Sequence, residues 1–216
     1  MIKKIVIIGP ESTGKSTLCE KLAKHYNTLW VSEYAREYLE KNGTEYSYND
    51  LLTIAKGQIE LEEAAINEQS AMRNQQLAVS SNSNRNQIPA FGKENSVTNT
   101  QTNPLSSIPS EDRKFLFIDT DMYVMKVWAE FVFNKCHNWI LNRIAERKYD
   151  LYLLCDVDLP WVEDTLREYP DKKIREKLFL FYKELMINQT TPWCTISGNY
   201  EERLEKAIQF IDNSFT

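Results

Sequence analysis

The stretch GPESTGKST, residues 9–17, decides the fold of this chain. It fits the pattern G-x-x-x-x-G-K-[ST], in which the backbone N–H groups of a loop turn inward around the phosphates of a nucleotide. Gly9 and Gly14 allow backbone angles and a close approach that a side chain would block. We expect Lys15 to reach the β- and γ-phosphates and the Ser16 hydroxyl to ligate Mg²⁺. The predicted nucleotide-binding residues of the loop are Gly9, Glu11, Ser12, Thr13, Gly14, Lys15, Ser16 and Thr17.

The sequence on both sides of this loop has the pattern that the loop requires. Residues 2–8, IKKIVII, form a short β-branched apolar run typical of a buried parallel strand. After the loop, Leu18, Leu22, Ala23 and Tyr26 recur at helical spacing. The positive N-terminal end of that helix would point at the phosphates. A chance match in a glycine-rich turn would lack these flanks.

Composition and charge limit the class of protein. With 216 residues, 42% of them hydrophobic, the chain is long enough for a single α/β domain over residues 1–216. Its net charge of −5 argues against a broad nucleic-acid-binding surface. The four cysteines form no C-x-x-C pair and the two histidines add no metal-ligand spacing, so we expect reduced thiols and a cytoplasmic protein. No apolar run resembles a signal peptide or is long enough to span a membrane. The oligomeric state stays open, a homo-oligomer included.

Apolar runs alternate with helical patterns along the chain. The strand candidates are residues 2–8, 28–32, 114–121, 149–157 and 192–198. The helix candidates after the first one are residues 33–43, 47–69, 122–133, 138–147, 161–167 and 199–211. This alternation predicts a doubly wound, three-layer α/β/α fold around a five-stranded parallel sheet, with its ligand site at the carboxyl ends of the strands.

Residues 70–112 differ in character from the rest of the chain. They are rich in Ser, Asn, Gln and Thr and contain three of the seven prolines. They show no apolar periodicity, so they cannot bury enough surface to offset the entropy lost on ordering. We expect a disordered or loosely attached insertion between a helix and the next strand, and a functional lid is the alternative interpretation.

Carboxylates follow two of the predicted strands. Asp119 closes an apolar strand, the position from which a carboxylate supports Mg²⁺ beside a phosphate loop. Asp121 would point to the same side if the strand continued, so it is assigned to Mg²⁺ or to a substrate hydroxyl. Glu33 ends the second strand and is the first candidate for the base that takes the proton of an alcohol acceptor, with Asp121 the other. Arg36 lies one helical turn after Glu33 and would orient it or the acceptor. A solvated helix start is the alternative for Glu33, because acids favour that position.

The stretch from Arg167 to Lys177 carries five positive side chains. Such side chains in a mobile segment can close over phosphates and stabilise the charge of a transition state. Arg167 and Lys173 are the candidates for this role. The alternative is a charged, solvated helix face.

Six motifs occur in order along the chain: GPESTGKSTL, SEYAREYL, AKGQ, FIDTD, PWVEDTLR and SGNYEERL. Together they resemble the NadR-type ribosylnicotinamide kinase domain and its single-domain, AAA-family ATPase-like relatives, over nearly the whole chain except residues 70–112. The resemblance implies a P-loop kinase fold, ATP and Mg²⁺, and phosphorylation of the 5′-hydroxyl of nicotinamide riboside in NAD biosynthesis. It implies that Glu33 and Arg36 face the nucleoside, that Asp119 and Asp121 close the metal and ribose side, that Arg167 belongs to a lid, and that Gly198, Asn199 and Tyr200 lie at the adenine.

The sequence departs from that family at one position. Family members that bind a pyridine ring can carry an aromatic residue just before the Glu of the EY-x-RE motif, and here that residue is Ser32. A stacking platform for the ring would have to come from Tyr34, Tyr123 or Trp128.

Two other functions stay open. One is an NTP-driven switch without a small acceptor, although the chain lacks the N-K-x-D and D-x-x-G patterns of a GTPase. The other is a kinase for a different nucleoside or for a nucleotide, although a nucleotide acceptor would favour an extra pair of arginines, and Arg36 stands nearly alone.

Overall fold

The chain folds around one five-stranded parallel sheet. The computed structural model describes residues 2–83 and 114–215. The strands are β1 (Lys3–Ile8), β2 (Trp30–Val31), β3 (Phe115–Asp119), β4 (Leu151–Cys155) and β5 (Trp193–Ile196), in the order β2-β3-β1-β4-β5. The helices are α1 (Lys15–His25), α2 (Tyr34–Asn42), α3 (Tyr48–Ser83), α4 (Met122–Phe133), α5 (Asn138–Glu146), α6 (Lys172–Asn188) and α7 (Tyr200–Phe215). The predicted five-stranded parallel sheet and α/β alternation are confirmed.

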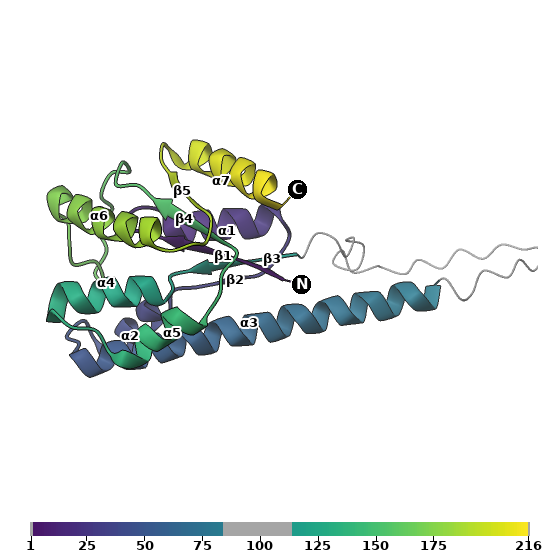
Figure 1. Cartoon of the computed structure of the whole chain (residues 1–216), viewed down its shortest axis with the longest axis horizontal. Coiled ribbons are helices and arrows are strands. Elements are labelled where there is room, and N and C mark those ends of the chain that lie inside the picture. Colours follow the sequence, from purple (N-terminus) through teal and green to yellow (C-terminus); the bar gives the residue numbers. More distant parts are fainter. Residues whose placement is uncertain (1, 84–113, 216) are drawn as a thin grey trace, which may run out of the picture.

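Alternating residues of the central strands divide the core between the two faces of the sheet. On β1, Ile5 and Ile7 pack with α1 and α7, whereas Val6 and Ile8 pack with α3, α4 and α6. All four side chains are fully buried, as expected for a parallel strand covered on both faces. A further apolar cluster joins α2, α3, α4 and α5 beyond the edge of β2. The layers are therefore helix, sheet, helix, as predicted (Figure 1).

Two predicted elements differ from the structure near the site. The third strand ends at Asp119 instead of Asp121, because Thr120 has a φ of 79° that leaves the extended conformation. Residues 161–167, predicted as a helix, form turns and irregular chain. Prolines at 160 and 170 bracket this segment. The N–H of Val162 donates to Ser12 in the loop after β1, and those of the following Glu168 and Tyr169 donate to Glu11, so these groups take part in no helical ladder.

The boundary of the predicted insertion was also wrong at its start. Helix α3 continues to Ser83, so residues 70–83 are helical (Figure 1). Alanine, glutamine, leucine and methionine in this stretch are good helix formers, so the helix can continue without apolar periodicity. Residues 84–112, the rest of the predicted insertion, lie outside the described residues. Among the described residues, no helix has the length and apolarity that crossing a bilayer requires.

Candidate active site

The loop between β1 and α1 has the backbone that its glycines predict. Gly9 and Gly14 have φ values of 143° and 77°, and a Cβ at Gly9 would lie 2.8 Å from the carbonyl oxygen of Cys155. Gly14 directly precedes α1, so the unpaired N–H groups of the first turn open onto the loop. Lys15 is 9% exposed, and its ammonium donates to the Pro10 carbonyl at 3.0 Å. The backbone of the loop therefore has the conformation that an anion-binding turn requires.

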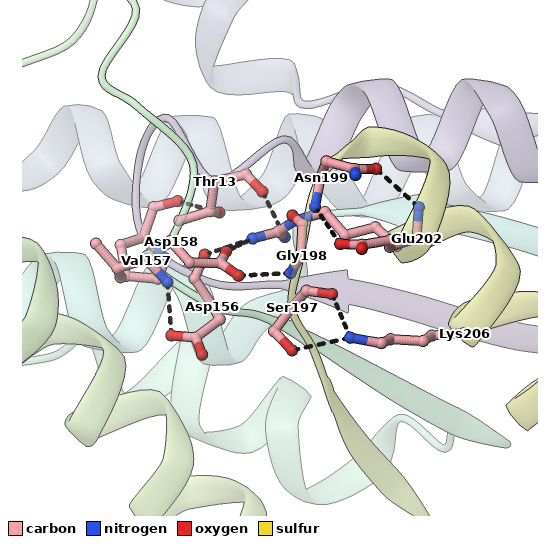
Figure 2. Close-up of polar contacts among 11 residues, drawn as sticks. Thr13, Asp156, Val157, Asp158, Ser197, Gly198, Asn199, Glu202 and Lys206 are labelled. Carbon is pink, nitrogen blue, oxygen red and sulfur yellow. Dashed lines mark hydrogen bonds and ion pairs between the residues drawn. The ribbon is translucent and has the colours of Figure 1, made fainter.

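Arg203 of α7 fixes this loop to two others. Its buried guanidinium donates to the carbonyl oxygens of Thr13, Asp156 and Gly198 at 3.0, 3.0 and 2.7 Å, and it is ion-paired with Asp158. Figure 2 labels these four partners, which lie close together. The same Asp158 carboxylate accepts from the N–H of Gly198 at 2.5 Å. The planar guanidinium of an arginine has five donors in fixed directions and can reach all of these acceptors. The ammonium of a lysine cannot. One side chain therefore holds the phosphate loop, the end of β4 and the β5–α7 loop together.

We expect Arg203→Lys to weaken the binding of a non-hydrolysable ATP analogue about 10-fold, the equivalent of about 1.4 kcal/mol, because a lysine leaves buried carbonyl groups without donors. Titration calorimetry measures this. Lys206→Ala is the control, because it removes another cation from the same helix. Among the described residues, the Lys206 ammonium forms hydrogen bonds only with Ser197. Equal affinity of the Arg203 variant and the native protein would contradict the assignment.

Asp119 lies beneath the loop at the end of β3. It is fully buried, and its Oδ2 atom has no hydrogen-bond partner in the described part of the chain. The Ser16 hydroxyl bonds to the same carboxylate. Among the described residues no group of three or more His, Cys, Asp and Glu side chains could hold a metal. Mg²⁺ is usually bound through one or two carboxylates plus phosphates and waters, so a hydroxyl and one orphaned carboxylate oxygen fit it.

Burial, with the Glu33 carboxylate nearby, raises the pKa of Asp119 to about 6 from an ordinary 3.8. Because this pKa is raised, the contribution of Asp119 to folding stability is fully present below pH 3.8 and is lost as the pH rises through 6. We therefore expect Asp119→Asn to stabilise the nucleotide-free, metal-free protein at pH 8 by up to about 3 kcal/mol. This gain should shrink toward pH 4.5, and Mg²⁺ should no longer tighten nucleotide binding. Urea denaturation at both pH values measures the gain, and a less stable variant at pH 8 would contradict it.

The hydrogen bonds of Asp121 are with α4 and β4 and not with the phosphate loop, unlike the sequence-based assignment. Its Oδ1 accepts from the N–H groups of Tyr123 and Val124 and so caps α4, and its Oδ2 accepts from the Tyr152 hydroxyl at 2.8 Å. Burial raises the pKa of Asp121 to about 7. With every oxygen bonded inside the protein, this carboxylate has a structural role, and neither metal nor base chemistry is supported by its contacts.

Glu33 and Arg36 both line a cavity of about 350 Å³ that also contains the phosphate loop. Glu33 occupies the position before α2 but makes no capping bond with its side chain. Arg36 pairs with Asp164 at 2.6 Å and with Glu40 at 3.6 Å. The structure thus brings the predicted base and the predicted arginine to the same cavity as Lys15.

The segment of residues 160–170, called the lid segment below, lies against the phosphate loop. The N–H of Val162 donates to Ser12 Oγ at 3.0 Å, and those of Glu168 and Tyr169 donate to Glu11 Oε2 at 3.0 and 3.1 Å. Arg167 lines the cavity and donates to Ser12 Oγ at 3.4 Å. Glu11 and Ser12 therefore hold the lid segment, a role that the sequence pattern of the loop does not reveal.

The cavity also has an apolar part of its wall, away from the residues of the phosphate loop in sequence. The residues of this apolar wall are Leu39, Val124, Val127, Trp128, Phe131, Tyr169, Leu178 and Tyr182. Trp128, one of three predicted platforms, lines the cavity, and its Nε1 donates to the Tyr46 hydroxyl at 2.7 Å. That hydroxyl donates to Glu168 of the lid segment at 2.9 Å. The wall can hold a flat ring without charged partners.

Several predicted site residues lie elsewhere. The ring of Tyr34 packs on Gly57, and that of Tyr123 packs on Tyr152 with centroids 5.8 Å apart. Lys173 is exposed in the first turn of α6, and its N–H is capped by Asp171. Asn199 caps α7 through its Oδ1, and Gly198 is bonded to Arg203, whereas Tyr200 lines the cavity beside Gly14.

Sequence reasoning missed three residues of this site. Arg203 and Asp164 lie within the motifs SGNYEERL and PWVEDTLR, and Gln58 ends AKGQ. The motifs marked all three positions, but their partners are distant in sequence and only the fold reveals them.

A family model described as "AAA domain" matches residues 4–83 and 93–203 of the chain. The trifunctional NAD biosynthesis/regulator protein NadR of Escherichia coli (strain K12) is 22% identical over 97% of the chain, and so is the NadR of Salmonella typhimurium (strain LT2). The chain spans 42% of the length of these curated relatives.

Solved structures share the fold. A crystal structure of NadR protein in complex with NR matches with a TM-score of 0.64 at 18% identity. The match covers 99% of this chain and 50% of the NadR chain. One of NadR in complex with NAD and AMP-PNP gives 0.62 at 20% identity, with 99% and 49% covered. Thymidylate kinase from Ehrlichia chaffeensis gives 0.56 at 12% identity, with 97% and 98% covered. The fold is therefore that of the P-loop kinases.

Proposed function

Because the chain belongs to the AAA domain family and is NadR-like in sequence and fold, we propose that it is an ATP-dependent kinase that phosphorylates the 5′-hydroxyl of a nucleoside. One observation carries the proposal: the phosphate loop and the carboxylate of Glu33 line one cavity, together with an apolar wall. A cavity that held only a nucleotide would need the phosphate loop but would not need the Glu33 carboxylate or the apolar wall.

The arrangement suits transfer of a phosphoryl group to an alcohol. Lys15 and the N–H groups at the start of α1 would hold the phosphate tail. Ser16 and Asp119 would hold Mg²⁺, which would supply positive charge to neutralise that tail. Glu33 accepts the proton of the acceptor hydroxyl while the oxygen of that hydroxyl forms a bond to the γ-phosphorus. The bond from that phosphorus to the β,γ-bridging oxygen breaks, and ADP leaves. Arg36 and Arg167 add positive charge on the lid side of the cavity.

Nicotinamide riboside is the acceptor we propose. Trp128 and Phe131 offer aromatic surface for a flat ring, in place of the residue at 32. Arg36 is already paired with Asp164 and Glu40, so the described residues that line the cavity offer no pair of unengaged arginines for a second phosphate. This favours a nucleoside over a nucleotide. The free thiols of the described residues agree with the cytoplasmic location that we propose.

The test is an assay of ADP formation with ATP, Mg²⁺ and a panel of nucleosides and nucleoside monophosphates. We expect turnover with nicotinamide riboside, and formation of its 5′-monophosphate shown by mass spectrometry. Turnover with thymidine or a monophosphate alone would assign a different acceptor. Hydrolysis at one rate with every acceptor, and none phosphorylated, would replace the kinase by an NTP-driven switch.

A further inference from the structure

Gln58 on α3 is a buried amide beside the ends of two strands. It is 2% exposed. Its Nε2 donates to the carbonyl oxygens of Ser32 at 3.2 Å and Asp119 at 3.3 Å, and its Oε1 accepts from the N–H of Tyr34 at 2.8 Å. Both amide hydrogens and the amide oxygen are therefore used, and all three partners are backbone groups.

These partners surround the two carboxylates of the candidate site. Ser32 and Tyr34 are the neighbours of Glu33 in the chain, and the third partner is the backbone of Asp119 itself. The Glu33 side chain makes no capping bond, and β2 pairs with β3 through Trp30 and Val31 alone. The sheet therefore gives the junction of β2 and α2 little support, and the amide of Gln58 supplies it.

The preceding residue adds a contact that fixes the same junction. A Cβ at Gly57 would lie 2.1 Å from the Tyr34 ring, so only glycine leaves room for that ring on α3. Tyr34 is thus held by α3 twice, through its ring and through its N–H. The Gln58 amide completes this arrangement, because its Nε2 bonds to the carbonyl just before Glu33 and to the carbonyl of Asp119, so one side chain holds the backbone at both carboxylate residues.

We propose that Gln58 is a positioning residue that sets the Glu33 carboxylate against Asp119, and so aligns the acceptor hydroxyl with the phosphate chain that the loop would hold. The role rests on the proposed kinase function. An amide suits it because one side chain supplies two donors and one acceptor at a fixed spacing.

The same helix carries a matched control at Gln69. It is 1% exposed, and its Nε2 donates to the Phe115 carbonyl at 2.7 Å and to Thr28 Oγ1 at 3.0 Å. Phe115 begins β3 and Asp119 ends it. Gln58 and Gln69 therefore hold the same strand by the same chemistry, at opposite ends, and only Gln58 is at the end that carries the site.

The experiment compares Gln58→Glu with Gln69→Glu in the kinase assay. A glutamate keeps the shape of glutamine but loses both donors, so each variant removes amide-to-carbonyl bonds from one end of β3. We expect Gln58→Glu to lower kcat about 30-fold with the KM for ATP changed less than about 3-fold, since distance and alignment at the reacting atoms are lost while the phosphate loop is intact. Gln69→Glu should lower the melting temperature with kcat within about 2-fold.

Gln58→Met and Gln69→Met keep the comparison informative if the added charge prevents folding. Equal loss of kcat in the 58 and 69 variants, or kcat within about 3-fold of the native value in both Gln58 variants, would overturn the proposal. Absence of turnover in the native protein would instead overturn the kinase function. The Mg²⁺ dependence of ATP-analogue binding then decides: a requirement for about 5-fold more Mg²⁺ in Gln58→Met alone supports the positioning of Asp119, and an unchanged requirement overturns it.

Discussion

Replacement of Lys15 by alanine is expected to lower phosphoryl transfer at least about 1,000-fold, because the variant loses the one ammonium that the phosphate loop presents to the transferring phosphate. The effect should appear in kcat and in the affinity for ATP together. Lys15 is 9% exposed in a cavity of about 350 Å³, where water screens its charge poorly. ADP release under saturating acceptor, with titration of an ATP analogue, measures both effects.

Lys24→Ala is the matched control for Lys15. Lys24 is an exposed lysine of the same helix, so its loss should leave activity within about 2-fold. Both variants should melt cooperatively, because Lys15 contributes only a hydrogen bond to Pro10 to the fold. A Lys15 variant that is folded and retains a tenth of native turnover would remove the phosphate loop from the mechanism.

Replacement of Glu33 by glutamine is expected to lower transfer by about 100- to 10,000-fold while ATP still binds. The amide is isosteric with the carboxylate but does not take a proton from the acceptor hydroxyl. Because Glu33 makes no capping hydrogen bond, the change should leave the start of α2 intact. Two measurements separate this result from that of Lys15→Ala. Product formation should fall in both variants, whereas the affinity for an ATP analogue should fall only in Lys15→Ala.

The control for Glu33 is Glu37, an exposed acid of the first turn of α2. Glu37→Gln removes the same charge from the same helix and should leave turnover nearly unchanged. If both variants lose activity equally, the net charge of α2 matters and Glu33 is not the base. If Glu33→Gln alone stays fully active, the acceptor hydroxyl loses its proton to another group.

The phosphate loop, its flanks and the strand that ends at Asp119 could be predicted because each is a local pattern. Glycine spacing fixes the loop, and buried parallel strands read as continuous apolar runs. Asp121 shows the limit of such reasoning. This residue follows a strand, which suggests a metal or substrate role, but it also directly precedes a helix, where acids serve as caps. In the structure Asp121 caps α4 by accepting from the N–H groups of Tyr123 and Val124.

The lid segment could not be predicted because its partners lie far away in the chain. Charged residues at 163–168 suit a helix locally, but Val162, Glu168 and Tyr169 donate their N–H groups to Glu11 and Ser12 instead. Three tertiary hydrogen bonds outweigh the weak local helix propensity of a short segment between prolines. The roles of Gln58 and Arg203 were hidden for the same reason.

The direction of α3 places the candidate site and the attachment points of residues 84–113 at opposite ends of the sheet. Its Gln58 lies beside the carboxyl end of β3, its Gln69 lies beside the amino end, and the helix then continues to Ser83 past the sheet, while the chain re-enters the sheet at Lys114 (Figure 1). Both attachment points of residues 84–113 are therefore on the side of the molecule opposite the cavity. A reporter fused between these two attachment points would therefore join the chain at the edge of the sheet that is farther from the cavity, which makes them suitable points for engineering.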